Sequence, residues 1–219
     1  MKRCNLQKFN KQIIFSKKDL AAVDSSISPG SLNSNIHRWI EDRTLIQLKN
    51  GLYISGELFE QYRYDRSFNI AIANSLRFPS YVTADTILRE HDILSDATFG
   101  ITSFTLKITR VYENLTGTYR YHKIKKDLYC GYNKRHFNDK EVFFASKAKA
   151  LFDFLYLKSQ FLPVHIKNVN VTEELRLNLD SFSKEDYIEF DSYRKLVAGT
   201  KQERIINNIM HYASDYTVA

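Results

Sequence analysis

Residues 15–54 constrain the fold more than any other part of the chain. Ser16, followed three residues later by Asp19, has the capping-box pattern that begins a helix. Residues 24–30 then interrupt the helical pattern with Ser, Pro and Gly, as expected of a turn. The next segment predicts an amphipathic helix over residues 32–42, because its apolar residues recur at helical spacing: Leu32, Ile36, Trp39 and Ile40.

The same stretch ends in a predicted β-hairpin. Residues 45–48 and 52–54 are short apolar runs on either side of Lys49-Asn50-Gly51, and Asn-Gly is the strongest short-range hairpin signal. Helix, turn, helix and hairpin in this order are the layout of a winged helix-turn-helix. We therefore expect residues 1–60 to form a DNA-binding domain of this kind.

Residues 61–219 are expected to form a second, mixed α/β domain with an antiparallel-rich sheet and C-terminal helices, so the fold class is α+β. β-rich runs separated by turn residues predict strands at residues 98–103, 108–112, 118–124, 128–132 and 142–145. Apolar spacing predicts helices at residues 5–14, 66–77, 82–90, 146–157 and 187–197, and a last one after Gly199. Residues 55–65 are interpreted as a connector.

Positive charge is concentrated in two segments. The net charge is +7, which favours a polyanionic partner. Residues 1–50 hold nine Lys and Arg against four acids, and residues 105–149 hold eleven against four. Residues 170–219 reverse the balance, with nine acids against six bases. This distribution predicts one face for nucleic acid and another for a different partner.

Polar side chains occupy the face opposite the apolar stripe of the predicted helix at residues 32–42. Arg38 is able to bind a guanine edge and Asn35 an adenine edge, each worth about 1–3 kcal/mol of discrimination. A solvated face of an ordinary amphipathic helix is the alternative. We favour recognition because the hairpin tip would reach a phosphate or the minor groove. The residues expected to contact or flank bases, or to hold the hairpin on DNA, are Ser31, Ser34, Asn35, Arg38, Lys49 and Asn50.

A second basic region follows in the predicted strands. From residue 107 onward, Lys and Arg alternate with aromatic residues, a mixture that matches phosphate contact combined with base stacking. A half-buried sheet with Lys and Arg on its wet face explains the pattern equally well. The expected phosphate anchors of the chain are Lys17, Lys18, Lys107, Arg110, Arg120 and Lys123.

Catalytic and cofactor patterns are absent from the sequence. The six His residues form no HExxH pair, and there is no Gly-rich phosphate loop. Cys4 and Cys130 fit no metal-ligand spacing, and a metal-dependent nuclease, the remaining enzymatic alternative, would need clustered carboxylates. No apolar run approaches the roughly 20 residues that span a bilayer. We therefore expect a cytoplasmic protein that is not an enzyme, with no cofactor, no metal and no membrane partner.

Five segments also carry a family pattern by their order and spacing. They are residues 39–53 (WIEDRTLIQLKNGLY), 79–83 (PSYVT), 101–103 (ITS), 145–153 (ASKAKALFD) and 175–182 (LRLNLDSF). Together they resemble the AbiEi-type antitoxins, over nearly the whole chain. The chain departs from this family before the Lys-Ala-Leu helix, where many relatives carry Pro-Glu and this sequence has residues 146–151 (SKAKAL).

The resemblance implies an N-terminal winged-helix domain, a C-terminal antitoxin domain and transcriptional autorepression. The implied partners are double-stranded DNA, as inverted repeats in the protein's own promoter, and a nucleotidyltransferase-like toxin of a type IV system. In many such systems the antitoxin counters the toxin's effect without a stable complex. The alternative is an interaction protein whose acidic C-terminal half grips the toxin directly, with DNA binding incidental.

Overall fold

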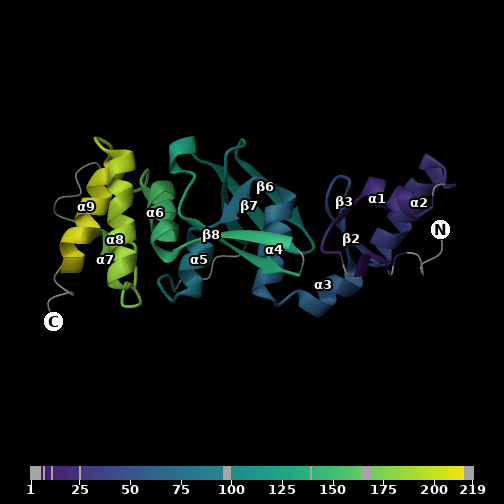
Figure 1. Ribbon diagram of the computed structural model, residues 1–219, viewed down its shortest axis with the longest axis horizontal. Helices are drawn as coiled ribbons and strands as arrows, with labels where there is room; N and C mark the ends of the chain where they lie inside the picture. The colour runs from purple at the N-terminus through teal and green to yellow at the C-terminus, as the bar shows by residue number, and fades with distance from the viewer. Residues whose placement is uncertain are drawn as a thin grey trace.

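The computed structural model describes residues 6, 8–10, 12–24, 26–95, 100–138, 140–163 and 169–214. Figure 1 shows an elongated molecule with three parts in a row. A small N-terminal unit with a three-stranded antiparallel sheet lies at one end, a six-stranded mixed sheet lies in the centre, and a group of helices lies at the other end. The predicted α+β class is confirmed at this level.

The N-terminal unit consists of β1 (Phe15–Ser16), α1 (Lys17–Val23), α2 (Pro29–Glu41), β2 (Leu45–Lys49) and β3 (Leu52–Ser55). β3 lies between β1 and β2 and is antiparallel to both. One face of this sheet and the two helices enclose a separate apolar cluster. Its buried members are Leu6, Phe9, Phe15, Leu20, Leu32, Ile36, Trp39, Leu45 and Tyr53.

Both helices of this unit begin at serine caps. The predicted capping box of α1 is confirmed: the backbone N of Asp19 donates to Ser16 Oγ, and the Asp19 carboxylate accepts from the backbone N of Ser16. α2 begins earlier than predicted, because Ser28 caps it and Pro29 occupies its first turn. Proline is favoured there, since its fixed φ suits a helix and its missing N–H would have no helical partner.

The predicted helix at residues 5–14 is wrong. Among the described residues of that stretch, 8–10 form a 3₁₀ turn, and Ile13 and Ile14 lie outside any helix. The apolar residues serve two cores rather than one helical face. Leu6 and Phe9 join the N-terminal cluster, whereas Ile13 and Ile14 join the larger core. Residues 1–5, 7 and 11 lie outside the described residues.

The β2–β3 hairpin joins the N-terminal unit to the central sheet. One face of the hairpin belongs to the N-terminal cluster, and the other face buries Ile46, Leu48 and Ile54 in the larger core. From the central sheet, Asn114 Nδ2 donates to the carbonyl of Leu48 at 2.9 Å. The orientation of α2 relative to the sheet is therefore held by apolar packing on both sides of the hairpin.

A helix that the sequence analysis missed follows the hairpin directly. α3 (Gly56–Tyr62) occupies the segment interpreted as a connector, and Ser55 caps its first turn. Gly56 is buried at its start, and a Cβ there would collide with the backbone carbonyl of Arg43. The glycine therefore permits the close approach between this helix and the end of the preceding turn.

The central sheet has the order β6-β7-β5-β4-β9-β8. Its strands are β4 (Ser80–Val82), β5 (Ile101–Thr105), β6 (Arg110–Asn114), β7 (Gly117–Lys123), β8 (Tyr132–Phe137) and β9 (Lys140–Ala145). The pairs β6–β7, β4–β5 and β8–β9 are antiparallel, whereas β5–β7 and β4–β9 are parallel. The sheet is thus mixed, with antiparallel pairs in the majority.

Helices cover both faces of this sheet. α4 (Arg66–Leu76) lies on the face to which Tyr121 points, because the Tyr121 hydroxyl donates to the carbonyl of Ala73. α6 (Lys147–Lys158) lies on the opposite face, where the Tyr81 hydroxyl donates to Asp153. α5 (Asp85–Glu90) packs against α6 and β5.

Two predicted elements of the central part differ from the structure. Residues 128–132 do not form a strand; a 3₁₀ turn ends at Leu128 and β8 begins only at Tyr132. The predicted helix at residues 82–90 is shorter, because β4 extends to Val82 and α5 starts at Asp85. Residues 96–99, which include the start of the predicted strand at 98–103, lie outside the described residues.

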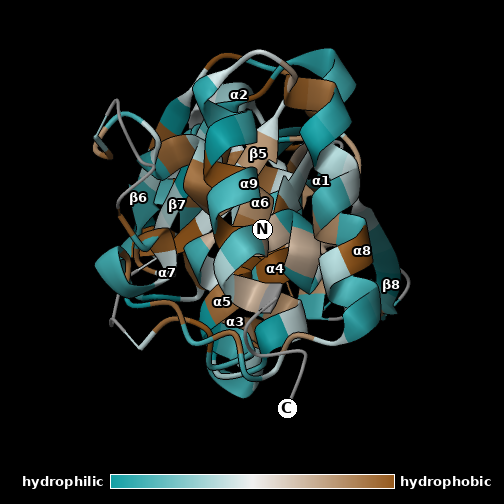
Figure 2. Cartoon of the chain, turned by 90° about the vertical axis from the view of Figure 1, so that its left-hand side faces the viewer, coloured by the Kyte–Doolittle hydropathy of each residue, from teal (hydrophilic) through white to brown (hydrophobic). Residues whose placement is uncertain are grey.

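The C-terminal helices are α7 (Val171–Glu174), α8 (Lys184–Ser192) and α9 (Lys201–Ser214), with a 3₁₀ segment, η3 (Tyr193–Val197), after α8. The predicted helix at residues 187–197 is therefore the end of α8 plus η3. α8 packs against α6, and α9 packs against α6, α7, α8 and η3. In Figure 2, which views this end of the molecule, the helices alternate hydrophilic and hydrophobic surfaces.

Candidate nucleic-acid interface

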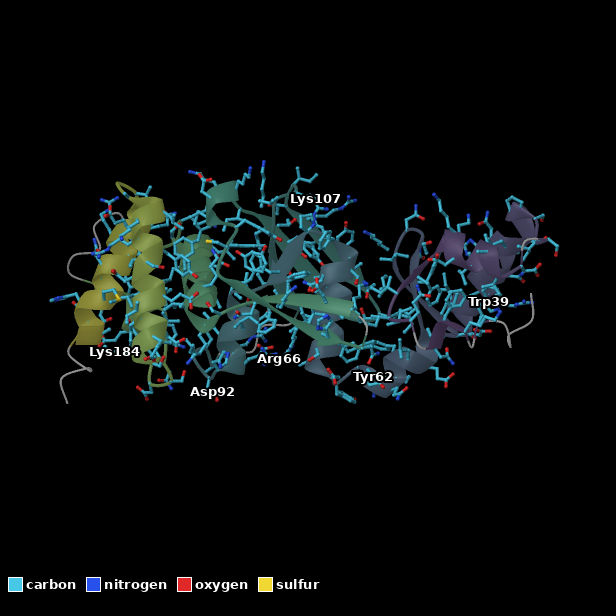
Figure 3. All side chains as sticks on the ribbon, in the orientation of Figure 1. Trp39, Tyr62, Arg66, Asp92, Lys107 and Lys184 are labelled. Carbon is cyan, nitrogen blue, oxygen red and sulfur yellow. The ribbon has the colours of Figure 1, made fainter. Side chains whose placement is uncertain are left out.

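α2 presents an apolar face to its own unit and a polar face to solvent. Leu32, Ile36 and Trp39 are buried, and Trp39 is fully covered within the N-terminal unit (Figure 3). On the opposite side Ser31, Ser34, His37 and Arg38 are exposed and Asn35 is half-buried. The side chains predicted to contact bases are thus not packed beneath the rest of the chain.

Arg38 and Asn35 contact each other on this polar face. Arg38 Nη2 donates to Asn35 Oδ1 at 3.0 Å, as residues three apart on a helix are placed to do. An arginine with one nitrogen so engaged keeps further N–H donors, and the asparagine keeps its own amide donors. The pair therefore presents a group of donors whose positions are fixed relative to each other.

The first turn of α2 carries no acidic residue. Ser31 Oγ accepts from Ser28 Oγ at 2.9 Å, and Ser34 Oγ donates to the carbonyl of Gly30 at 3.2 Å. These serine hydroxyls bond within the helix start, which leaves Arg38 and Asn35 as the longer polar groups of this face. A helix N-terminus is a favourable place for an anion, because its backbone N–H groups and its dipole both attract negative charge.

Three segments of the N-terminal unit meet beside this helix start. The backbone N of Lys17 donates to the carbonyl of Gly51 at 3.1 Å, which joins the start of α1 to the hairpin turn. A shallow hollow between them is lined by Ser16, Lys17, Lys18, Ala21, Ile27, Pro29, Leu32 and Gly51. Lys18 and Asn50 are exposed and Lys17 is half-buried. Two predicted phosphate anchors therefore lie close to the start of α2.

Lys49 has a different environment from the one predicted for a hairpin tip. Its Nζ donates to the carbonyl of Leu76, the last residue of α4, at 2.5 Å. It also lies 5.5 Å from the centroid of the Tyr112 ring. The ammonium group thus stabilises the C-terminal end of α4, where the helix dipole favours a cation. Asn50 remains as the exposed predicted contact at the turn.

The four predicted anchors in the central sheet do not share one face. The register pairs Arg110 with Tyr121 and Val111 with Arg120. Since side chains alternate along a strand, Arg110 and Lys123 are on the face of Tyr121, and Arg120 is on the opposite face. Lys107 is exposed in the segment before β6, and Figure 3 shows it over the central part of the molecule, away from Trp39.

Arg77, which lies near the N-terminal unit, was missed by the sequence analysis. Arg77 Nη2 donates to the carbonyl of Ile108 at 2.6 Å, and Nη1 lies 3.5 Å from the Tyr112 hydroxyl. With Lys49 at 5.5 Å and Arg110 at 5.4 Å from the same ring, three cations surround Tyr112. In the described part of the chain, none of the three has a carboxylate within ion-pair distance. No sequence pattern predicts the contact of Arg77 with Ile108 and Tyr112, because these residues are more than 30 positions away along the chain.

Acidic groups lie at the margins of this surface. Hydrogen bonds from the backbone and side chain of Ser16 hold the pKa of Asp19 below its usual range. Glu41 and Asp42 are exposed at the C-terminal end of α2, where they would repel phosphates. The N-terminal half of α2 is therefore a more favourable place for an anionic group than its C-terminal half.

Among the described residues, no group of three or more His, Cys, Asp or Glu side chains is placed to hold a metal ion. No described helix combines the length and apolar character needed to cross a membrane. No protein-family model matches the chain, and no curated protein matches it either.

Proposed function

We propose that this protein is a DNA-binding transcriptional repressor in which residues 1–60 form a winged helix-turn-helix and α2 is the recognition helix. The observation that carries the proposal is the exposed polar face of α2 on a helix whose other face holds the core of the N-terminal unit. α1 precedes α2 across a short turn, and the β2–β3 hairpin follows it. This order of elements is typical of helix-turn-helix proteins with a wing.

In this proposal, residues of α2 contact the bases, and residues beside the start of α2 contact the phosphates. Arg38 and Asn35 contact base edges as a bonded pair, and each specific base contact contributes about 1–3 kcal/mol of discrimination. Ser31 and Ser34 flank the bases. Lys17, Lys18 and Asn50 contact the phosphates beside the start of α2, which positions the helix without specifying a sequence.

Residues outside the N-terminal unit extend the phosphate contact. Lys107, Arg110 and Lys123 are exposed, and each phosphate they neutralise would add nearly one unit to the salt dependence of binding. Arg120, on the other face of the sheet, contributes least. Lys49 acts mainly by fixing the hairpin, since its ammonium group already bonds to the end of α4.

The proposal includes an antitoxin role, supported by the five segments that resemble AbiEi-type antitoxins. The protein would repress its own promoter through inverted repeats and counter a nucleotidyltransferase-like toxin without a stable complex. Direct neutralisation is the second candidate, favoured by exposed Glu173, Glu174 and Glu185 at the C-terminal end of the molecule. A stoichiometric complex with the toxin that survives moderate salt during purification would support this second candidate.

Binding to the DNA upstream of the protein's own gene tests the regulatory proposal. We expect the full-length protein to protect a discrete site in footprinting and to bind that duplex at least tenfold more tightly than a scrambled duplex of equal length, since the two differ in base contacts and not in phosphates. Equal affinity for both duplexes, with no protected site, would contradict the proposal.

A further inference from the structure

β8 forms one edge of the central sheet. Its pairing partner is β9, and no described strand pairs with its other side. The opposite edge strand, β6, has the hairpin of the N-terminal unit packed beside it. Figure 2 shows β6 and β8 on opposite sides of the molecule, with a hydrophilic β8 at the outer rim.

The backbone bonds of the neighbouring strand show which groups of β8 face outward. Phe143 in β9 bonds away from β8, because its N donates to Asn74 Oδ1 at 2.6 Å and its carbonyl accepts from Asn74 Nδ2 at 3.3 Å. Ser146 bonds toward the β8 side, since its N donates to the carbonyl of Gly131 at 3.1 Å. In an antiparallel pair, bonded and non-bonded positions alternate.

Applied to the register of β8 and β9, this alternation divides the residues of β8 into two sets. Lys134 lies opposite Phe143, so its backbone N–H and carbonyl point away from β9. The residues two positions before and after it share that orientation. The outward set is therefore Tyr132, Lys134 and His136, and no described group bonds to their backbone.

β8 lacks most of the features that protect an edge strand. Its six residues pair with β9 without a register shift and include no proline or glycine. Proteins usually prevent strand addition with bulges, prolines or charged side chains. Only the last of these is present, as Lys134 and Arg135; Lys134 is paired with Glu141 of β9, which leaves Arg135 as the main source of positive charge at this edge. Such an edge repels a basic strand and attracts an acidic one.

Arg135 supplies a second, independent sign of a missing acidic partner. Its Nε and Nη2 atoms are buried and make no hydrogen bond, and its guanidinium lies 4.6 Å from the centroid of the Phe144 ring. A buried donor without an acceptor is costly. Glu141, which lies opposite His136 in the ladder, pairs with Lys134, and Glu90 pairs with Arg66.

The charge of Arg135 also acts on Arg66. Burial, and then repulsion by Arg135, lower the pKa of Arg66. Two guanidinium groups are thus close enough to repel each other at this side of the sheet, and one of them has unbonded donors. A carboxylate placed beside the half-buried Arg135 side chain would reduce this repulsion, and it would bond the buried donors once that side chain turned outward.

We propose that β8 is a docking edge for an extended acidic peptide segment of a partner protein. The segment adds as a further strand through the outward backbone groups of Tyr132, Lys134 and His136, and a carboxylate of the segment binds Arg135. Strand addition of this kind takes its affinity from backbone bonds and its specificity from alternate side chains. Pairing with a second copy of β8 is disfavoured, because it would bring two basic strands together.

A labelled peptide tests this proposal without knowledge of the natural partner. The probe is acetyl-Glu-Val-Glu-Val-Glu-Val-Glu-amide, and the control peptide has Lys in place of every Glu. We expect the full-length protein to bind the Glu peptide at least tenfold more tightly than the Lys peptide in fluorescence anisotropy, because charges at the edge discriminate between them.

Two variants at one position separate backbone pairing from charge. Lys134→Pro removes an outward N–H and should weaken binding at least tenfold, whereas Lys134→Ala keeps that N–H and should weaken it only a few-fold. Proline is tolerated at such an outward position of an edge strand, and circular dichroism checks that the fold is retained. Arg135→Gln should weaken binding more than Lys134→Ala does and less than Lys134→Pro does.

Further measurements keep the proposal falsifiable if Lys134→Pro does not fold. The wild-type protein should then fail to bind a Glu peptide that carries an N-methyl group at every residue, because neither edge of that peptide keeps N–H donors for a β8 partner. Equal binding of the methylated and unmethylated peptides, equal binding of the Glu and Lys peptides, or no binding at about 1 mM, which corresponds to only about 4 kcal/mol, would each overturn the proposal. If Lys134→Pro does fold, the finding that the wild-type protein sediments as a dimer and this variant as a monomer would also overturn the proposal.

Discussion

Lys149 and Asp153 form a fully buried ion pair in α6. Lys149 Nζ donates to Asp153 Oδ1 at 2.7 Å, and both side chains have 0% exposure. Asp153 also accepts from Tyr81 at 3.0 Å and from Thr83 at 2.7 Å. The pair therefore joins α6 to β4 and to Thr83, the residue that follows β4. Lys149, Tyr81 and Thr83 each donate to the Asp153 carboxylate inside the core.

Asp153→Asn removes one charge and leaves the other buried. We expect the free energy of unfolding to fall by about 3–5 kcal/mol, because an uncompensated buried charge is strongly destabilising. Urea denaturation measures this change. Glu141→Gln, which breaks an exposed pair with Lys134, is the matched control and should leave stability almost unchanged. Similar losses for both variants would contradict this role of the buried pair.

Asp19 makes the stability of the N-terminal unit depend on pH. Hydrogen bonds from Ser16 lower its pKa in the folded state below the usual 3.8. Its contribution is therefore fully present above about pH 4 and is lost as the pH falls through the lowered pKa. Asp19→Asn should make the protein less stable at pH 7 and reduce the loss between pH 5 and pH 2, as measured by thermal unfolding. An unchanged pH profile would rule this out.

The exposure of the polar face of α2 was predictable from sequence, whereas the contact made by Lys49 was not. The 3.6-residue period places Ser34, His37 and Arg38 opposite the apolar stripe, with Asn35 at the flank, without any knowledge of the fold. The partner of Lys49 is the carbonyl of Leu76, 27 residues away, and no local pattern reports such a contact.

At the scale of elements, the β2–β3 hairpin connects two cores. Asn114→Ala should destabilise the protein by about 1–3 kcal/mol, because the half-buried carbonyl of Leu48 loses its donor. Hydrogen exchange should show faster opening of β2 and α2, with α9 unchanged. Asn133→Ala, at an exposed position of β8, is the control. Equal exchange in α2 for both variants would show that Asn114 does not hold the hairpin.

Elements with a strong local signal were predicted well, and those set by tertiary contacts were not. α1 and α6 begin at the serines that the sequence indicated. The helix expected at residues 5–14 failed because its apolar residues divide between two cores. The parallel pairs β5–β7 and β4–β9 were not predicted, since partner choice in a parallel sheet depends on crossovers rather than on local sequence.

At the scale of the whole molecule, the proposed DNA surface extends from the N-terminal unit to the central sheet. Lys107→Ala should therefore reduce the slope of log affinity against log salt by nearly one unit, without a change in sequence preference. Lys184→Ala removes the same charge at the opposite end of the molecule (Figure 3) and should leave the slope unchanged. The two slopes come from DNA titrations at several salt concentrations. Equal slopes for both variants would confine the interface to the N-terminal unit.

The most direct test of the central claim compares Arg38→Ala with Arg204→Ala. Both remove one exposed arginine, the first from α2 and the second from α9 at the other end of the molecule (Figure 1). In titrations with the operator and a scrambled duplex, Arg38→Ala should weaken operator binding by about 5- to 150-fold, since a specific base contact is worth about 1–3 kcal/mol. It should change binding to the scrambled duplex much less, and Arg204→Ala should change neither. If Arg38→Ala weakens both duplexes equally, or behaves like Arg204→Ala, α2 does not read the sequence.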